Sequence, residues 1–264
     1  MTKLTSLICA ALLACSATAS ASPILSGFKL TNVAAVDDGS TLVNLAGGMK
    51  LGLNGTIFSS LFVNTNGNVS FGSGMSLFSP TAFNGNAYSN SFLAPFFGDV
   101  DIRNGHGSIG YGNTQFDGHN AFAVTWDKVG YYGSNDDKRN TFQLMLVDRS
   151  DTGANNFDFY YNYGALTWDQ GDKARAGFHM VGTAADFEFK GSGSPNKLLD
   201  AGSLALISGS NVGVVGRYAF NVRDGVAAYG MAAGDKVHGV PQPGSLALLG
   251  IGMLALALGR RRKA

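Results

Sequence analysis

The chain has little cysteine, little charge and little proline. Its two cysteines, Cys9 and Cys15, both lie in the first 21 residues, so the rest of the chain has no disulfide, thiol nucleophile or cysteine metal ligand. Charged residues make up 14% of the chain and prolines number six, and no charged or proline-rich linker divides it. Glycine, with 37 residues, and aromatic residues, at 11%, are abundant, which is typical of extracellular strand-and-turn proteins.

Net charge excludes one class of partner. The full chain has 19 basic and 18 acidic residues, and without Lys3 and the four basic residues of 260–263 the balance becomes 14 against 18, a net charge of −4. A mildly acidic protein lacks the basic surface on which nucleic-acid binding depends. We therefore expect no nucleic-acid partner.

The first 21 residues have the composition of a secretory signal peptide. Lys3 precedes an apolar stretch over residues 7–14, and Ala19 and Ala21 are small residues suited to a cleavage site. We predict removal of residues 1–21. The alternative is lipoprotein processing at Cys15, which would leave the apolar region very short.

The last 25 residues, 240–264, form a second terminal signal. A proline element, an apolar run over residues 245–258 and a basic cluster follow one another, with the key residues Val240, Pro241, Gln242, Pro243, Arg260, Arg261, Arg262 and Lys263. A helix of about 15 residues is roughly 22 Å long, shorter than the roughly 30 Å hydrocarbon core of a bilayer. Basic residues after the run hold that end on the cytoplasmic side. We expect a transient, cleavable anchor, with an ordinary membrane anchor as the alternative.

This order of elements resembles the PEP-CTERM sorting signal of exported proteins in exopolysaccharide-producing Gram-negative bacteria. The resemblance implies recognition by an exosortase, an intramembrane cysteine transpeptidase that removes the tail. It also implies export through the inner membrane and delivery to the cell surface or beyond. Gln242 replaces the acid of the usual Pro-Glu-Pro centre, so the sequence leaves open whether the tail is processed.

Short apolar runs separated by turn residues fill the chain between the two signals. The clearest hairpin spans residues 61–71, because the Asn66-Gly67 dipeptide tolerates the positive φ values that tight turns need. Residues 92–101 form an aromatic run that ends in two carboxylates, and further strands are expected at residues 121–126, 141–147, 157–163, 176–181, 185–189 and 218–222. The run at 157–163 alternates with period two and predicts a half-buried strand with Asp158, Tyr160 and Asn162 on the open face.

These patterns predict an all-β fold. We expect an antiparallel β-sandwich-like single domain over residues 22–239 with few short helices, flanked by the signal peptide and the C-terminal hydrophobic helix. The best short helix candidate is residues 196–206. Without disulfides the core must supply the stability, and the expected core residues are Trp126, Phe142, Phe157, Phe159, Trp168 and Phe178.

A series of motifs between residues 61 and 189 carries a second resemblance. In chain order they are Asn64-Thr65-Asn66-Gly67, Ala94-Pro95-Phe96-Phe97-Gly98-Asp99-Val100-Asp101, Thr125-Trp126-Asp127, Asn140-Thr141-Phe142-Gln143-Leu144, Leu166-Thr167-Trp168 and Ala176-Gly177-Phe178. They resemble the nidogen-like extracellular domain of matrix and cell-surface proteins, in which Trp often stands in place of Phe97. The resemblance implies an adhesion or matrix module and brings no set of catalytic residues with it.

Asp99, Asp101 and Asn104 form a candidate calcium site. They are oxygen ligands at close spacing in a protein bound for a calcium-rich compartment, but the loop pattern of an EF-hand is absent. The same carboxylates could instead accept hydrogen bonds from turn amides, which the sequence favours. Calcium is the one cofactor that we consider.

The remaining motifs have simpler interpretations. Gly105–Gly110 matches G-x-G-x-x-G, but no helix is expected after it, so we interpret it as a glycine-rich loop. The charged run 135–139 is interpreted as a solvated loop. Four tyrosines could stack on sugar rings if exposed, namely Tyr131, Tyr132, Tyr160 and Tyr163. A catalytic carboxylate pair, as in glycosidases, would be invisible in the sequence.

These observations lead to a ranked set of functions. The first is a non-enzymatic exported surface or extracellular-matrix protein with an adhesive or structural role in an exopolysaccharide or biofilm matrix. The second is a carbohydrate-binding, lectin-like module, and the third is a secreted glycoside hydrolase. The expected partners are an exosortase-like processing enzyme, extracellular polysaccharide or matrix components, and the membrane before the tail is removed.

Overall fold

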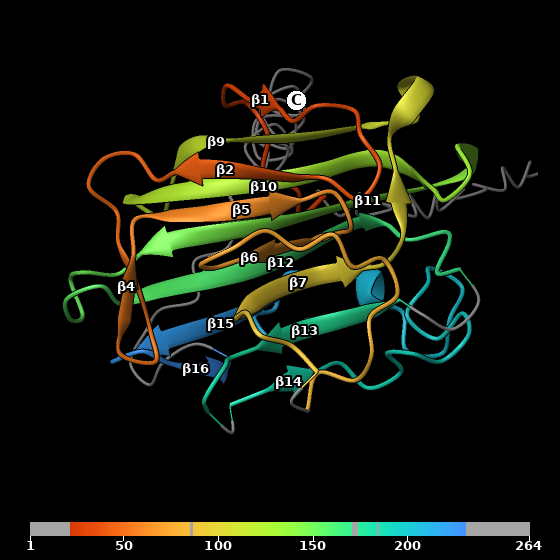
Figure 1. Cartoon of the computed structure of the whole chain (residues 1–264). Coiled ribbons are helices and arrows are strands. Elements are labelled where there is room, and N and C mark those ends of the chain that lie inside the picture. The colour runs from red at the N-terminus through yellow and green to blue at the C-terminus, as the bar shows by residue number, and fades with distance from the viewer. Residues whose placement is uncertain (1–21, 85–86, 171–173, 184, 231–264) are drawn as a thin grey trace, which may run out of the picture.

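The computed structural model describes residues 22–84, 87–170, 174–183 and 185–230. This part of the chain is all-β, with antiparallel sheets and two short 3-10 helices (Figure 1), so the predicted fold class is confirmed. The predicted signal peptide, with Ala19 and Ala21, and the sorting tail from residue 240 lie outside the described residues. Among the described residues, no helix is long and apolar enough to cross a membrane.

The larger sheet has eight strands in the order β1-β9-β10-β11-β12-β15-β16, with β8 paired to β10. Its strands are β1 (Thr31–Asn32), β8 (Val100–Asp101), β9 (Ser108–Phe116), β10 (His119–Tyr131), β11 (Asn135–Asp148), β12 (Phe157–Ala165), β15 (Arg217–Arg223) and β16 (Val226–Tyr229). The turn between β9 and β10 is Asp117-Gly118, with φ values of 51° and 80°. Both residues adopt the positive φ that a two-residue hairpin turn requires, so the sheet begins as a meander of neighbouring strands.

The smaller sheet has six strands in the order β14-β13-β7-β6-β5-β2 and lies over the larger one (Figure 1). Its strands are β2 (Ser40–Asn44), β5 (Ser60–Asn64), β6 (Asn68–Ser70), β7 (Phe92–Phe97), β13 (Arg175–His179) and β14 (Phe187–Glu188). A separate hairpin joins β3 (Leu51–Leu53) to β4 (Thr56–Phe58), and the 3-10 helices are η1 (Arg103–Gly105) and η2 (Leu206–Ser208).

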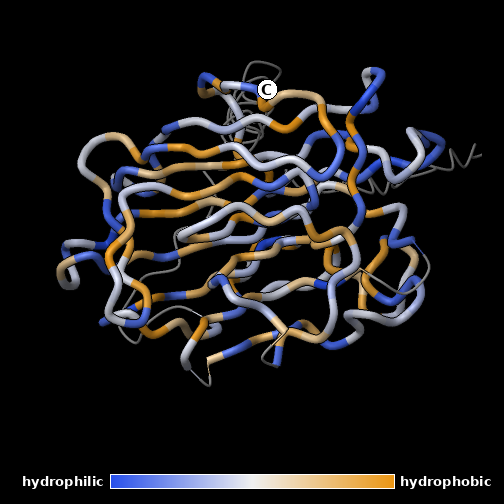
Figure 2. The backbone as a smooth tube through the Cα atoms, viewed as in Figure 1, coloured by the Kyte–Doolittle hydropathy of each residue, from blue (hydrophilic) through white to orange (hydrophobic). Residues whose placement is uncertain are grey.

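The main core fills the space between the two sheets. All six residues predicted for it are buried, and the Trp126 ring stacks on Phe142 with 5.1 Å between centroids. The Trp126 Nε1–H donates to the Thr65 carbonyl, 3.0 Å away, in the β5–β6 turn. This bond fixes the hairpin of one sheet to a strand of the other. Hydrophobic and hydrophilic positions alternate along many strands (Figure 2).

The β12 strand differs from its prediction in one respect. The period-two alternation is correct, but residues 157–163 are buried on both faces. Asp158 is covered by arginines, Asn162 receives a hydrogen bond from Arg217, and Tyr160 packs against Phe116. Polar partners and the N-terminal segment therefore cover the face that the alternation predicted to be open.

Two further predictions are wrong. Residues 196–205 form turns and bends instead of a helix, with Asn196 at a φ of 58°, outside the helical region, and only Leu206 belongs to a helix, the short η2. Residues 135–139 are not a loop but the beginning of β11, because Gly133 and Ser134, both at positive φ, complete the hairpin turn before them. Four of these five residues are exposed, as expected for a solvated segment. The glycine-rich segment Gly105–Gly110 was interpreted as a loop, but its second half, from Ser108, is the beginning of β9. No helix follows it, as expected.

Candidate functional site

Asp101 ends β8 and is completely buried. Its Oδ1 accepts hydrogen bonds from the backbone N–H and Nε of Arg103, both at 3.0 Å, and its Oδ2 lies 2.6 Å from Arg103 Nη2. Oδ2 also accepts the backbone N–H of Ser134 at 3.0 Å. Asn104, the third residue of the candidate calcium site, is directed to the Ser134 hydroxyl at 3.3 Å. The two oxygens of Asp101 thus accept hydrogen bonds from the turns that precede β9 and β11.

Asp99 lies in a different group from the one predicted. One carboxylate oxygen from each of Asp37, Asp38 and Asp99 lies within 4.8 Å of the others. Asp38 accepts a hydrogen bond from Asn66 Nδ2 at 2.7 Å, and Arg103 Nη2 lies 2.9 Å from Asp37 Oδ2. The Arg103 guanidinium therefore already supplies positive charge to both acidic groups. Calcium binding at Asp99, Asp101 and Asn104 stays a prediction.

The two carboxylates that contact Arg103 have opposite pKa shifts. Hydrogen bonds from Arg103 lower the pKa of Asp101 to about 2, although burial acts in the other direction. Burial raises the pKa of Asp37, and the charge of Arg103 only partly opposes this effect. Asp101 is therefore held as an anion over the whole physiological range. The adjacent Asp37-Asp38 pair was the sequence signal for this second group, and it was missed.

Of the four tyrosines considered for stacking on sugars, one is well exposed. Tyr132 is 60% exposed at the β10–β11 turn, whereas Tyr163 is buried in the main core and Tyr160 is buried in a second cluster on the other face of the larger sheet. Tyr131 is half-buried and donates its hydroxyl hydrogen bond to Asp137 at 2.7 Å. Tyr160 and Tyr163 are therefore not available for stacking on sugars, because alternate residues of β12 pack on both faces of the sheet.

A shallow groove of about 530 Å³ lies beside β15. Its lining includes Lys190, Asp200, Ser203 and Tyr218. Asp200 Oδ1 accepts the Leu166 backbone N–H at 2.7 Å, and burial raises the pKa of the Asp200 carboxyl. Hydroxyl, carboxyl and ammonium groups along one groove can hydrogen-bond a ligand rich in hydroxyl groups.

A smaller pocket of about 290 Å³ contains the carboxylates of Asp186 and Glu188. Glu188 pairs with Arg175 and accepts the Phe83 backbone N–H at 2.9 Å. Asp186 lies 2.9 Å from Nδ1 of His179. Both carboxylates therefore hold the β6–β7 connection and β13 in place, a structural use that leaves this pair poorly suited to general acid–base chemistry.

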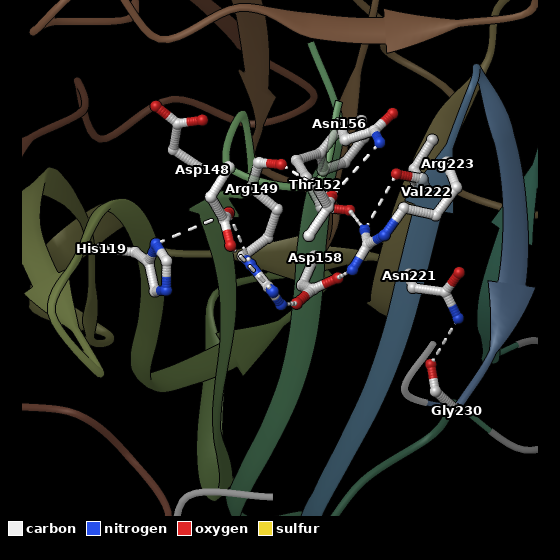
Figure 3. Close-up of polar contacts among 12 residues, drawn as sticks. His119, Asp148, Arg149, Thr152, Asn156, Asp158, Asn221, Val222, Arg223 and Gly230 are labelled. Carbon is white, nitrogen blue, oxygen red and sulfur yellow. Dashed lines mark hydrogen bonds and ion pairs between the residues drawn. The ribbon is translucent and has the colours of Figure 1, made fainter. Parts of the chain in front are cut away.

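The third polar cluster surrounds Asp158, which is 1% exposed (Figure 3). Arg149 Nη1 lies 2.7 Å from Asp158 Oδ2, and Arg223 Nη2 lies 2.7 Å from Oδ1. Arg149 also pairs with Asp151 at 3.0 Å, and Arg223 Nη1 donates to the Phe157 carbonyl at 3.0 Å. A buried carboxylate between two cations ties the β11–β12 turn to β15. We assign it a structural role.

The described residues form a two-sheet antiparallel sandwich, with acidic groups bonded into turns and shallow grooves on the surface, which defines an extended all-β sandwich module. The family model of the nidogen-like domain matches residues 59–224, and the chain belongs to this family. A second model, the PEP-CTERM protein-sorting motif, matches residues 239–263. Both resemblances drawn from the sequence are confirmed.

Three similar proteins are animal proteins. The chain is 30% identical to alpha-tectorin of Gallus gallus over 232 residues, which cover 73% of this chain and 10% of that protein. It is 31% identical to alpha-tectorin of Homo sapiens over 228 residues, with the same two shares. It is 28% identical to nidogen of Drosophila melanogaster over 143 residues, 51% of this chain and 10% of that protein. The chain thus spans about a tenth of these relatives, and no solved structure matches it significantly.

The two family matches establish the general destination of the protein. The PEP-CTERM motif implies processing by exosortase-type machinery, and the nidogen-like domain belongs to an extracellular class. Together they indicate an exported protein of the cell surface or the extracellular space.

Proposed function

We propose that this protein is a non-enzymatic module of the extracellular matrix, with an adhesive or structural role among exopolysaccharide and cells. One observation carries the proposal: a nidogen-like domain and a PEP-CTERM sorting motif occur on the same chain. The second element delivers the first to the compartment in which an adhesive domain acts.

The architecture is consistent with this role. Two sheets packed around a large aromatic core make a rigid body. The buried carboxylates Asp101 and Asp158 are both bonded to arginines, which stabilises the fold and leaves their oxygens engaged. A rigid body with exposed turns and grooves suits binding and assembly.

Processing of the tail tests the first half of the proposal. Mass spectrometry of the protein recovered from culture fluid, cell surface and membrane should find a mature chain that begins at Ser22 and ends near Pro243. Replacing Pro241 and Pro243 by alanine should leave the tail attached and move the protein to the membrane fraction. A wild-type protein found only in the membrane, with its tail intact to Ala264, would contradict sorting and leave the domain assignment unchanged.

Binding to isolated matrix tests the second half. The purified domain, residues 22–239, should bind to matrix from a strain that lacks the protein and should restore cohesion of that matrix. Release of reducing ends from the polysaccharide during the same assay would instead establish a hydrolase.

A carbohydrate-binding module is the second candidate, favoured by the groove with Asp200 and by exposed Tyr132. On a glycan array this candidate predicts saturable binding to a defined sugar. Binding lost in Asp200→Asn would locate the site in the groove, and binding lost in Tyr132→Ala would locate it at the β10–β11 turn. Tyr111→Phe is a control on β9, away from both places.

A further inference from the structure

An N-terminal arm, residues 22–33, is held on the outside of the larger sheet through its backbone. Gln143 on β11 forms two hydrogen bonds with Leu25, accepting its N–H at 3.0 Å and donating to its carbonyl at 2.9 Å. Arg217 on β15 donates from Nη2 to the Pro23 carbonyl at 2.6 Å. Contacts to main-chain atoms do not distinguish the arm of one copy from that of another.

The arm also completes a second apolar cluster on this face. Leu25 and Phe28 pack against side chains that point away from the main core, namely Phe116, Ala121, Ala123, Met145, Val147, Tyr160, Val212 and Ala219. Further along, Thr31 and Asn32 pair with β9 as strand β1. A Cβ atom on Gly112 would lie 2.2 Å from the Lys29 carbonyl oxygen. The absence of a side chain at Gly112 allows the arm to cross β9 closely.

The groups that receive the arm are buried and depend on it. Gln143 is 0% exposed and Arg217 is 2% exposed. The Arg217 guanidinium donates from Nε to the Asn162 side chain and from Nη2 to the Pro23 carbonyl. Its third nitrogen, Nη1, has no hydrogen-bond partner among the described residues. Removing the arm would uncover the apolar cluster and take away the hydrogen bonds of Gln143 to Leu25 and of Arg217 to Pro23, although Thr125 and Asn162 would still bond these two side chains. This face is therefore stabilised by a covering segment that supplies both main-chain hydrogen-bond partners and apolar side chains.

The segment that joins the arm to β2 is tight. The Val36 N–H bonds to the Ala34 carbonyl at 2.9 Å, and Asp38 has a φ of 51°. Leu30 and Val36 are each 43% exposed, so the arm and hinge carry apolar surface that is only partly covered. A short, constrained hinge next to a terminal element favours exchange of that element between copies.

We propose that the arm exchanges between copies of this protein, so that the arm-binding face of one copy takes residues 22–33 of another. Every contact described above is retained in the exchanged form, because both copies have the same sequence. The hinge is relaxed when it extends, and protein concentration then decides between the closed monomer and the exchanged dimer. The inference does not depend on the proposed function, since it concerns only the domain itself.

Introduced cysteines test the exchange, since residues 22–239 contain none. A Cβ on Gly110 would lie 3.2 Å from Leu30 Cβ, close to the separation in a disulfide, about 3.5–4.5 Å. We would mix Leu30→Cys protein with Gly110→Cys protein, allow exchange, oxidise, and identify the crosslinked peptides by mass spectrometry. Exchange predicts a 30–110 crosslinked dimer whose yield rises with protein concentration.

The matched control mixes Leu30→Cys with Val226→Cys, an exposed position on β16. Equal crosslink yields in the two mixtures would overturn the proposal. A protein that has both Leu30→Cys and Gly110→Cys would overturn it too, if its 30–110 crosslinks formed only within single chains. Light scattering on the wild-type domain is a second measurement that needs no cysteine. It should show a dimer at high protein concentration. Inserting Gly-Gly-Ser after Ala35 lengthens the hinge and should shift the domain back to monomer. A wild-type domain that stays monomeric at all concentrations would also overturn the proposal.

Discussion

Asp101 illustrates how a single residue in this protein acts through its partners. The sequence places it in a short acidic pattern, and the structure gives both of its oxygens to Arg103 and Ser134. Of the two uses considered for the carboxylates, turn stabilisation is the one seen at Asp101. The Asp37-Asp38 pair is visible in the sequence, but its position beside Arg103 is not, because only the folded chain brings that turn next to β8.

Asp101 predicts a pH dependence of stability. Its pKa in the folded protein is about 2, below the ordinary value of 3.8, so its contribution is present above about pH 4 and is lost as pH falls towards 2. Asp101→Asn should lower the free energy of unfolding at pH 7 by about 2 kcal/mol, with a much smaller difference at pH 2.5. Urea denaturation at both pH values measures this.

Asp37→Asn is the matched control, since burial raises the pKa of Asp37 and its ionised form is disfavoured in the folded protein. Its replacement should leave stability at pH 7 nearly unchanged or raise it. A loss for Asp101→Asn that is the same at both pH values would refute the role given to its charge.

Calcium gives a second prediction at this scale. Because Arg103 already neutralises Asp101 and Asp37, we expect the same thermal midpoint in calcium and in chelator. Differential scanning calorimetry of the domain compares the two conditions. A midpoint raised by calcium, and no longer raised in Asp99→Asn, would establish a calcium site there.

Among the elements, the β5–β6 hairpin has a turn whose residues Thr65 and Asn66 are buried. The sequence predicted its position from Asn66-Gly67, and the pairing of β5 with β6 confirms it. The sequence could not show that the turn is buried, with Asn64 and Asn66 at 0% exposure. That burial follows from contacts with β7 and β10, which are distant in sequence.

Gly67 should be irreplaceable in this hairpin. It has a φ of 78°, and a Cβ there would lie 1.8 Å from the Phe96 carbonyl oxygen. Gly67→Ala should cost more than about 4 kcal/mol or prevent folding. Gly118→Ala is matched in φ, at 80°, but has no atom within 4 Å of the added Cβ, and should cost only about 1 kcal/mol. Chemical denaturation distinguishes them, and similar costs would show that φ alone decides.

The Asp158 cluster joins three elements, and its removal tests that junction. Asp158→Asn leaves two arginines without a buried counter-charge, and should cost about 3–5 kcal/mol. Asp151→Asn removes a pair with the same Arg149, but the Asp151 side chain is 47% exposed, so the cost should stay below about 1 kcal/mol. If Asp158→Asn is as mild as its control in urea denaturation, the cluster does not hold β15 to the β11–β12 turn.

At the scale of the whole molecule, the two sheets are held by one shared aromatic core. Trp126 lies at its centre, buried and stacked on Phe142. Trp126→Ala should lower the free energy of unfolding by about 3–5 kcal/mol, measured by chemical denaturation. Tyr132→Ala, at the exposed turn, should change it by about 0.5 kcal/mol or less; a comparable loss at both positions would argue against a core centred on Trp126.

The sequence by itself determined the fold class, several of the strands in each sheet, the six core aromatics and both family resemblances. These follow from local patterns: period-two alternation, turn dipeptides and motif order are all written in neighbouring residues. Only the tertiary structure decided which polar residues meet. The grouping of Asp37 with Asp99, the arginines around Asp158 and the arm on Gln143 and Arg217 join residues far apart in the chain. Pairs of this kind depend on how two sheets and a terminal arm pack, and hydrophobic periodicity contains no information on that packing.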